Sequence, residues 1–290
     1  MKDISVIIVN HNNSKLLEEC LKSVYGSTHK ASLEVIVIDN ASSDNSVSMV
    51  KALFPEVKLI VNKENLGFIK ASNQGLRIYS GRYALLLNDD TVVKDGAFDK
   101  MLEFMDKTPK AGACGPKLLN KDETIQRQGS LLGKRFWRSP APKEVDFLVG
   151  ACLMVRRETI DKVGILDENF FFYTDDLDWC RRIKKAGWKI YFLPEPEVVH
   201  YKGWSSTRVF NKRLFVEGFR GGLYFCRKHY GLIAYFIYRP FLLISAFIAT
   251  ILTFMSYPLR KNKVEAIQRT EAYWEIFKIC VTGKITAQFA

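Results

Sequence analysis

Short apolar runs alternate with amphipathic segments along the first hundred residues. The runs lie at Ser5–Val9, Glu34–Ile38, Lys58–Val61 and Tyr83–Leu87, and the segments between them repeat apolar residues every three or four positions. Continuous apolar runs are typical of strands buried on both faces of a sheet. Apolar residues at every third or fourth position are typical of helices that cover such a sheet. The alternation therefore predicts an α/β fold with a doubly wound, mainly parallel sheet.

The pattern becomes mixed after Asp90. We expect strands at Asp146–Val155 and Trp188–Leu193, with a helix at Asp176–Ala186 between them. These elements extend the α/β domain, which is assigned to residues 1–207. Residues 208–290 are expected to form a helical region that is basic and partly hydrophobic.

One segment of that region is unusually apolar. Phe241–Tyr257 is a run of 17 residues without a charge, with Arg239 before it and Arg260 and Lys261 after it. Seventeen residues is the lower limit for crossing a bilayer, and basic flanks on both sides disagree with a single span. The segment predicts a membrane-associating helix or hairpin at the cytoplasmic face of the membrane. A span and a buried core helix both stay open as alternatives.

Charge is distributed unevenly along the chain. The formal net charge is +12, and residues 201–290 alone contribute 14 Lys and Arg against 4 Asp and Glu. A nearly neutral first part argues against a nucleic-acid-binding protein, and basic residues around an apolar run favour an anionic membrane surface as the partner. The six cysteines stand singly, which is typical of a reducing compartment, and the first residues have the pattern of a strand rather than of a signal peptide.

Polar residues follow the predicted strands where each one ends. Asn10, Asp39 and the pair Asp89-Asp90 hold these places, and ligands of open parallel sheets bind beyond the carboxyl ends of the strands. No dinucleotide or P-loop motif is present. The Asp39 carboxylate is able to accept a hydrogen bond from a base N–H or a ribose hydroxyl. The alternative is an aspartate that forms a turn or caps a helix. Asp89 and Asp90 suit Mg2+ or Mn2+ held together with substrate phosphates, although a plain turn is the alternative.

Two further candidates lie later in the chain. Asp175 and Asp176 open a predicted helix beside aromatic residues, which is compatible with a general base and also with simple pairing to the helix dipole. His200 follows a strand-like segment and is either a metal ligand or an ordinary core or surface histidine.

Taken together and in this order, the segments resemble the GT-A glycosyltransferases of family 2, in particular their bacterial rhamnosyltransferase-like branch. The resemblance covers residues 3–207 and rests on SVIIVNHNN, VIVIDNASSDNS, NLGFIKASNQGL, ALLLNDDT, FLVGACLMVRR, FFFYTDDLDWCRRIKKAGWKI and VVHYKGWSS. It implies a Rossmann-like GT-A domain that transfers a sugar from a nucleotide-sugar with inversion at the anomeric carbon.

The resemblance also implies roles for individual residues. Asp176 is the catalytic base, and Asp90 with His200 holds the divalent metal, Mg2+ or Mn2+. The donor-binding residues are Asn10, Asp39, Asn65, Gly67, Asp89 and Gly150. Asp175 and Trp204 are expected to support these residues rather than to contact the substrate. Here the family's DxD-type motif is NDD, and its Glu-Asp pair is Asp175-Asp176.

The expected function is therefore metal-dependent transfer, with rhamnose from dTDP-rhamnose as the first choice, in cell-surface polysaccharide or O-antigen synthesis. The partners are a dTDP- or UDP-sugar, a lipid-linked glycan acceptor and the membrane surface, without nucleic acid; the sequence is also compatible with an oligomer. Two alternatives stay open: a UDP-hexose or UDP-galactofuranose transferase, and a non-catalytic membrane-docking assembly partner.

Overall fold

The computed structural model describes residues 2–128, 135–171, 174–201, 210–260 and 262–285. The chain forms two compact units. Met1–Leu166 and Asp176–Lys202 make up the first, here called the sheet unit, and Asp167–Asp175 and Gly203–Ala290 make up the second, the helical unit. The chain thus passes from one unit to the other between Asp175 and Asp176.

The sheet unit contains all nine strands of the described chain in one sheet, with the order β3-β2-β1-β4-β8-β6-β9-β5 and β7 paired to β9. The strands are β1 (Ile4–Asn10), β2 (Leu33–Asp39), β3 (Lys58–Val61), β4 (Tyr83–Asn88), β5 (Thr91–Val93), β6 (Ala111–Leu119), β7 (Lys143–Val145), β8 (Cys152–Arg156) and β9 (Lys189–His200). Strands β1 to β4 are parallel, whereas β8 is antiparallel to both β4 and β6. The expected α/β sheet is confirmed, and its second half is mixed.

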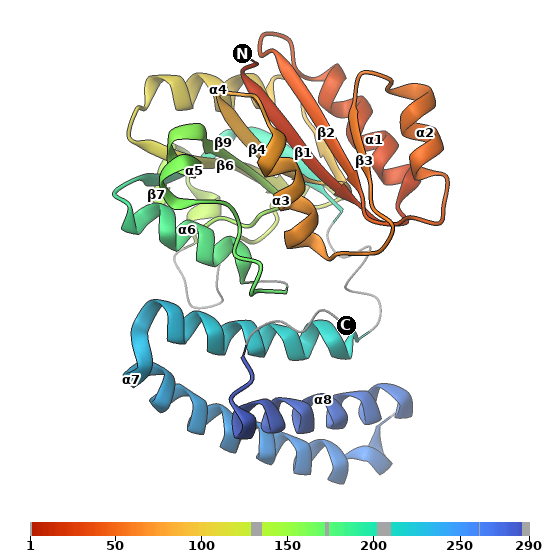
Figure 1. The fold of residues 1–290 in the computed structure, drawn as a ribbon, viewed down its shortest axis with the longest axis vertical. Helices are drawn as coiled ribbons and strands as arrows, with labels where there is room; N and C mark the ends of the chain where they lie inside the picture. The colour runs from red at the N-terminus through yellow and green to blue at the C-terminus, as the bar shows by residue number, and fades with distance from the viewer. Residues whose placement is uncertain (1, 129–134, 172–173, 202–209, 261, 286–290) are drawn as a thin grey trace. The chain divides into compact units, whose positions relative to one another are not determined.

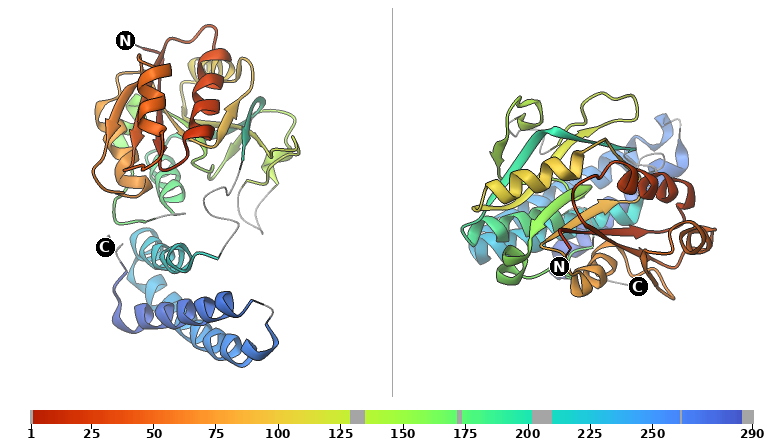
Figure 2. Two further views of the ribbon diagram at one scale, coloured as in Figure 1. Left: turned by 90° about the vertical axis from the view of Figure 1, so that its right-hand side faces the viewer. Right: turned by 90° about the horizontal axis from the view of Figure 1, so that it is seen from above.

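Helices cover both faces of this sheet (Figures 1 and 2). They are α1 (Ser14–Gly26), α2 (Ser46–Leu53), α3 (Phe68–Ile78), α4 (Ala97–Lys107), α5 (Arg157–Val163) and α6 (Asp175–Lys185), with a short 3-10 helix at Phe136–Arg138. Val6 and Ile8 of β1 pack in the core with α1, α2 and α4. Ile7 points to the other face, where Gly75 of α3 lies so close that a Cβ atom there would be 2.5 Å from an Ile7 methyl. Alternate residues of one strand therefore serve two helical layers.

Two expectations about strands need correction. The strand expected at Asp146–Val155 begins only at Cys152, and residues 146–151 form irregular chain between β7 and β8. The strand expected to end at Leu193 continues to His200 as β9. It passes Pro194 and Pro196 because the pairing with β6 shifts there, from Pro116 opposite Leu193 to Lys117 opposite Glu197. A register shift tolerates prolines, which cannot donate to the sheet.

The helical unit is built on α7 (Lys212–Met255) and α8 (Lys263–Thr282), with a 3-10 turn at Tyr257–Leu259 between them. Gly231 has φ 82° and ψ −175°, so α7 consists of two helical halves joined at this residue. The halves and α8 share a core that includes Leu223, Leu242 and Ile276. By its length and composition alone, α7 is long and apolar enough to cross a membrane. Its most apolar stretch has a mean hydropathy of 1.9, and 17% of that stretch is buried.

Candidate active site

The ends of three neighbouring strands bring the first candidate residues together. Asn10 of β1 lies opposite Asp39 of β2, and Val9 lies opposite Asn88 of β4. Parallel strands expose their last residues at one edge of a sheet, and ligands of such folds bind there. The polar residues that follow the apolar runs therefore share one edge, as the sequence predicted.

Asn10 and Asp39 form a buried pair at this edge. The Asn10 side-chain amide donates to Asp39 Oδ1 over 3.0 Å and to Ser42 Oγ over 3.1 Å, while Asp39 Oδ2 accepts from the backbone N–H of Ser42 over 2.9 Å. Both side chains are at most 1% exposed. Asn10 Oδ1 is buried and accepts no hydrogen bond from any residue that the structure describes. A buried acceptor without a donor is costly, so this atom suits a donor group on a ligand.

The loop before α3 is fixed to the same group of residues. Asn40 donates to Asn65 Oδ1 over 2.8 Å, and Asn65 Oδ1 also accepts from the backbone N–H of Gly67 over 2.9 Å. Gly67 caps α3 with φ 79°, a left-handed value that favours glycine, and no side chain caps this helix. The first backbone N–H groups of α3 are therefore not satisfied by a capping side chain, which is an arrangement suited to an anion.

Asp89 and Asp90 follow β4 directly. Burial and the adjacent Asp90 carboxylate raise the pKa of Asp89 to about 7, although hydrogen bonds from the Asn13 side chain and the His11 backbone act in the opposite direction. Asp90 is 7% exposed. Two carboxylates in such a place favour a cation as a third member.

His200, at the end of β9, lies against Asp90. Its Nε2 atom is 3.3 Å from Asp90 Oδ1 and 3.2 Å from the Asn88 amide nitrogen. Its Nδ1 atom is 2.9 Å from Gln126 Oε1. The Gln126 amide nitrogen donates to Asn120 Oδ1 and to the His200 carbonyl, so its oxygen accepts and Nδ1 carries the proton. The other ring nitrogen, Nε2, faces Asn88 and Asp90, so it lies on the side where a metal would be held.

Asp176, in the first turn of α6, contacts the chain that borders the end of β4. Its Oδ2 atom accepts from the backbone N–H of Gly150 over 3.1 Å, and its Oδ1 atom accepts from Leu177 N–H over 2.7 Å. The carbonyl of Ala151, the residue after Gly150, accepts a hydrogen bond from the backbone N–H of Asn88 over 3.0 Å. Burial raises the pKa of Asp176 to about 6, and the two backbone hydrogen bonds limit this rise. A carboxylate whose pKa lies near neutrality is suited to act as a general base.

The residues just before Asp176 belong to the helical unit. Phe170 is fully buried and its ring packs edge-on against Tyr224 of α7 with centroids 4.8 Å apart. Asp167 accepts from Tyr224 over 3.1 Å and from Lys228 over 2.6 Å. Gly221 approaches Thr174 so closely that a Cβ atom there would lie 2.8 Å from Thr174 Oγ1. The first half of α7 therefore fixes the segment that leads to Asp176.

The structure joins the predicted residues into three linked groups within the sheet unit. They are Asn10, Asp39, Asn65 and Gly67; Asp89, Asp90 and His200; and Gly150 and Asp176. Asp175 is 6% exposed and precedes them in the helical unit. Trp204 lies outside the described residues. Gln126 was not predicted, because it lies in an irregular segment whose sequence gives no sign that it contacts His200.

Among the residues that the structure describes, no group of three or more His, Cys, Asp or Glu side chains is arranged to enclose a metal. The acidic pair and His200 form an open arrangement instead. Such an arrangement needs ligand atoms from another molecule to complete a coordination shell.

Comparisons with known proteins identify the family. The sequence model for "Glycosyl transferase family 2" matches residues 5–164, more than half of the chain. The chain belongs to glycosyl transferase family 2. The resemblance read from the motifs is confirmed, and the protein is a glycosyltransferase.

The glycosyltransferase has relatives in bacteria and archaea. It is 28% identical over 241 residues to N-acetylglucosaminyl-diphospho-decaprenol L-rhamnosyltransferase of Mycobacterium tuberculosis, covering 71% of this chain and 78% of that one. It is 24% identical over 223 residues to the low-salt glycan biosynthesis hexosyltransferase Agl10 of Haloferax volcanii, covering 72% of this chain and 70% of that one.

A solved structure shows the same fold. The mannosyltransferase PcManGT of Pyrobaculum calidifontis, in complex with GDP-Man and Mn2+, superposes with a TM-score of 0.60 at 15% identity and covers 98% of this chain and 90% of that one. The expected GT-A fold is thereby confirmed.

Proposed function

We propose that this glycosyltransferase moves a sugar, with inversion, from a nucleotide-sugar to a lipid-linked acceptor at the cytoplasmic face of the membrane. The observation that carries the proposal is the hydrogen bond between Asp176 and Gly150. The next residue, Ala151, is bonded to Asn88 at the end of β4, directly before Asp89 and Asp90. A candidate base and a candidate cation site thus flank one strand end. An inverting displacement needs these two elements on opposite sides of the reacting carbon.

The first group of residues binds the nucleotide part of the donor. Asp39 is buried and offers a carboxylate at the end of β2, and the unpartnered Asn10 Oδ1 beside it accepts from a base N–H or a ribose hydroxyl. The uncapped start of α3, after Asn65 and Gly67, presents N–H groups to the diphosphate. All of these residues lie at the same edge of the sheet.

The residues of the second group fit a divalent metal. The pKa of Asp89 is raised partly by the Asp90 carboxylate, a repulsion that a bound cation relieves, and Nε2 of His200 lies 3.3 Å from Asp90 Oδ1. Asp90 and His200 would hold Mg2+ or Mn2+, with Asp89 beside them and the remaining ligand places left to phosphate oxygens. When bound, the ion neutralises the charge that develops on the leaving diphosphate.

Asp176 takes the proton of the acceptor hydroxyl. With a pKa of about 6, the carboxylate is largely ionised at neutral pH and is still basic enough to accept a proton. The N–H of Gly150 fixes one of its oxygens, which orients the other for the acceptor.

Similarity supports the choice of sugar and acceptor. The mycobacterial relative is named for transfer of L-rhamnose to N-acetylglucosaminyl-diphospho-decaprenol, and it aligns with most of this chain. We assign dTDP-rhamnose as donor and a polyprenyl-diphosphate-linked sugar as acceptor, in cell-surface glycan synthesis. A UDP-hexose or UDP-galactofuranose donor is the rival within the same fold.

The second half of α7 supports attachment to the membrane. It carries an exposed apolar face, made of Ile233, Phe236, Ile237, Phe241, Ile244, Phe247, Ile248, Ile251, Leu252 and Met255. These residues recur every three or four positions, so they lie along one side of the helix. Ten exposed apolar residues along one side of a helix are typical of a surface that contacts a membrane.

The partner helix indicates how the segment lies. Arg239 of α7 donates to the carbonyls of Cys280 and Val281, so α8 runs beside this half of α7. Helix α8 carries Glu265, Arg269, Glu271, Glu275 and Lys278. A crossing α7 would take these charges into hydrocarbon at about 3 kcal/mol for an Arg or Lys at the centre. We therefore place α7 in the plane of one leaflet.

The test is a thermal-shift series on the full chain in detergent, because a ligand that binds only the folded state raises its stability. We expect dTDP-rhamnose to stabilise the protein in the presence of Mn2+ or Mg2+ and to lose this effect in EDTA. A larger shift with a UDP-hexose would reject the rhamnose assignment. No shift with any nucleotide-sugar would favour the non-catalytic assembly partner instead.

A further inference from the structure

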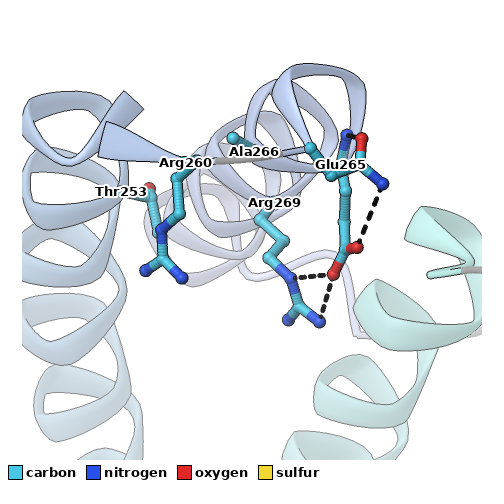
Figure 3. Close-up of a pocket in the computed structure, with 6 residues that line it drawn as sticks. Thr253, Arg260, Glu265, Ala266 and Arg269 are labelled. Atoms are coloured by element: carbon cyan, nitrogen blue, oxygen red, sulfur yellow. Dashed lines mark hydrogen bonds and ion pairs between the residues drawn. The ribbon is translucent and has the colours of Figure 1, made fainter. Parts of the chain in front are cut away.

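A small cavity lies where α7 turns into α8, within the helical unit (Figure 3). Its volume is about 210 Å³, and it is lined by Thr253, Arg260, Asn262, Glu265, Ala266 and Arg269. Figure 3 shows the side chain of Arg260, after the turn, and that of Arg269, on α8, extending toward the same side in this view. Two guanidinium groups are therefore presented at one opening.

Arg269 is held in a fixed position. Its Nε and Nη2 atoms both lie 2.8 Å from Glu265 Oε1, and its guanidinium carbon is 4.3 Å from the centre of the Phe210 ring. Asn262 in turn accepts from the Glu265 backbone N–H over 3.1 Å, which fixes the first turn of α8. One side of the cavity is thus ordered before any ligand arrives.

Arg260 is held less completely. Its Nε atom donates to Ser256 Oγ over 3.3 Å, and its two terminal nitrogens make no hydrogen bond or ion pair with any other residue that the structure describes. The neighbouring Lys263 is already engaged, because it donates to the carbonyls of Tyr257 and Pro258 over 2.9 and 2.8 Å. Among the described residues of this turn, Arg260 is therefore the cation that keeps donors for a ligand.

The turn continues the exposed apolar face of α7. Phe254 and Met255 are 72% and 69% exposed, and Leu259, directly before Arg260, is 87% exposed. When this face enters the acyl region of a leaflet, Arg260 and Arg269 come to the level of the lipid phosphates, because long basic side chains reach from apolar surroundings to the polar boundary.

We infer that the cavity binds the phosphate group of an anionic phospholipid. The two terminal nitrogens of Arg260 offer paired N–H donors that match phosphate oxygens, and Arg269, whose Nε and Nη2 are bound to Glu265, adds its Nη1 donors and its charge from the other side of the cavity. The inference rests on the membrane attachment proposed above and adds a defined headgroup site to it. Nothing in the transfer reaction itself requires this site, since its residues all lie in α7, α8 and the turn between them.

The experiment measures binding of the full chain to vesicles of phosphatidylcholine with and without phosphatidylglycerol. The test variant is Arg260→Gln/Arg269→Gln. The control is Arg227→Gln/Lys278→Gln, which removes the same charge from exposed positions of the same unit. We expect the test variant to lose about ten times more affinity for the anionic vesicles than the control. Equal losses in the two variants would reject the site and leave only general attraction between charges.

A second variant tests the geometry of the donors. Arg260→Lys/Arg269→Lys keeps the charge and removes the paired donors, so we expect it to bind anionic vesicles several-fold more weakly than the natural chain. Binding equal to that of the natural chain would contradict the inference. The thermal shift with donor and metal shows that each variant is folded. Failure of the natural chain to bind either kind of vesicle would overturn the membrane attachment itself.

Discussion

Asp176 and Gly150 are joined by a hydrogen bond of 3.1 Å from the backbone N–H of the glycine to Oδ2 of the carboxylate. A backbone donor cannot rotate away, so it fixes the carboxylate more firmly than a flexible side chain would. It also stabilises the ionised form of a group whose burial favours the neutral one. The same contact ties the candidate base to the chain that borders the acidic pair.

Changing Asp176→Asn should remove transfer and leave donor binding unchanged. Loss of a general base lowers the turnover number by about 10²- to 10⁴-fold, because the amide cannot accept the proton. Transfer of radiolabelled sugar and the thermal shift with donor measure the two effects. Asp161→Asn, at an exposed position, is the matched control and should retain full turnover. Normal turnover in the Asp176 variant would show that another group is the base.

The raised pKa of Asp176 predicts how transfer depends on pH. The base works only when ionised, so kcat should rise from pH 5 to pH 7 with a midpoint near 6. Folding responds in the opposite sense, since a carboxyl whose folded pKa is raised from 3.8 to about 6 costs stability as pH rises between these two values. We therefore expect Asp176→Asn to melt higher than the natural chain at pH 8 and equally at pH 3. A flat pH profile of kcat would contradict the assignment.

Asp90→Asn should weaken the dependence of donor binding on metal. Removing one carboxylate from a site with so few protein ligands is expected to raise the Mn2+ concentration needed for half-maximal donor binding by at least about tenfold. Titration calorimetry with nucleotide and Mn2+ measures this value. Asp95→Asn, exposed and five residues further along the chain, should behave as the natural protein. Identical metal dependence in both variants would exclude a metal role for Asp90.

Gln126 is expected to act through His200. Gln126→Leu removes the acceptor for Nδ1 and should weaken metal-dependent donor binding about 10- to 100-fold, as losses of such supporting contacts do. Gln126→Glu keeps an acceptor at the same place and should restore most of this binding. Equal defects in the two variants would indicate that Gln126 serves packing alone.

Gly221→Ala tests the contact between α7 and the segment before Asp176. The new methyl group would lie 2.8 Å from Thr174 Oγ1, so the segment must shift, and we expect kcat to fall several-fold while donor binding stays unchanged. Gly218→Ala is the control. Gly218 lies on the same helix, and a Cβ atom added there would have no neighbouring atom within 4 Å. The double variant Gly221→Ala/Thr174→Ala removes the oxygen and should recover activity. Equal kcat values for the Gly218 and Gly221 variants would contradict this coupling.

The parts of the site that sequence predicts are those fixed by local rules. Asp39 and Asp90 follow buried strands, and parallel pairing brings the ends of such strands to one edge whatever the rest of the chain does. The residues themselves mark the Asp175-Asp176 pair as a candidate base, whereas Gly150 and the choice of Asp176 within the pair come from the resemblance, because the contact between Gly150 and Asp176 joins an irregular segment to the start of a helix. Gln126 was missed for the same reason: its partner His200 is 74 positions away.

The course of the later strands was harder to predict. Pro194 and Pro196 ordinarily end a strand, yet β9 continues because a shift in its pairing accommodates them. The assignment of Asp167–Asp175 to the helical unit is equally non-local, since it depends on how Phe170 packs against Tyr224. Apolar spacing indicates that a residue is buried, but it does not indicate against which neighbour.

The passage from one unit to the other at the peptide bond between Asp175 and Asp176 has a consequence for kinetics. Under the proposed function, the donor arrives from bulk water at the sheet unit, whereas the acceptor diffuses in two dimensions along the surface that α7 occupies. Turnover then follows the mole fraction of acceptor in the bilayer rather than its amount per volume. Diluting the acceptor with inert lipid slows such an enzyme even when every molecule in the tube is still present.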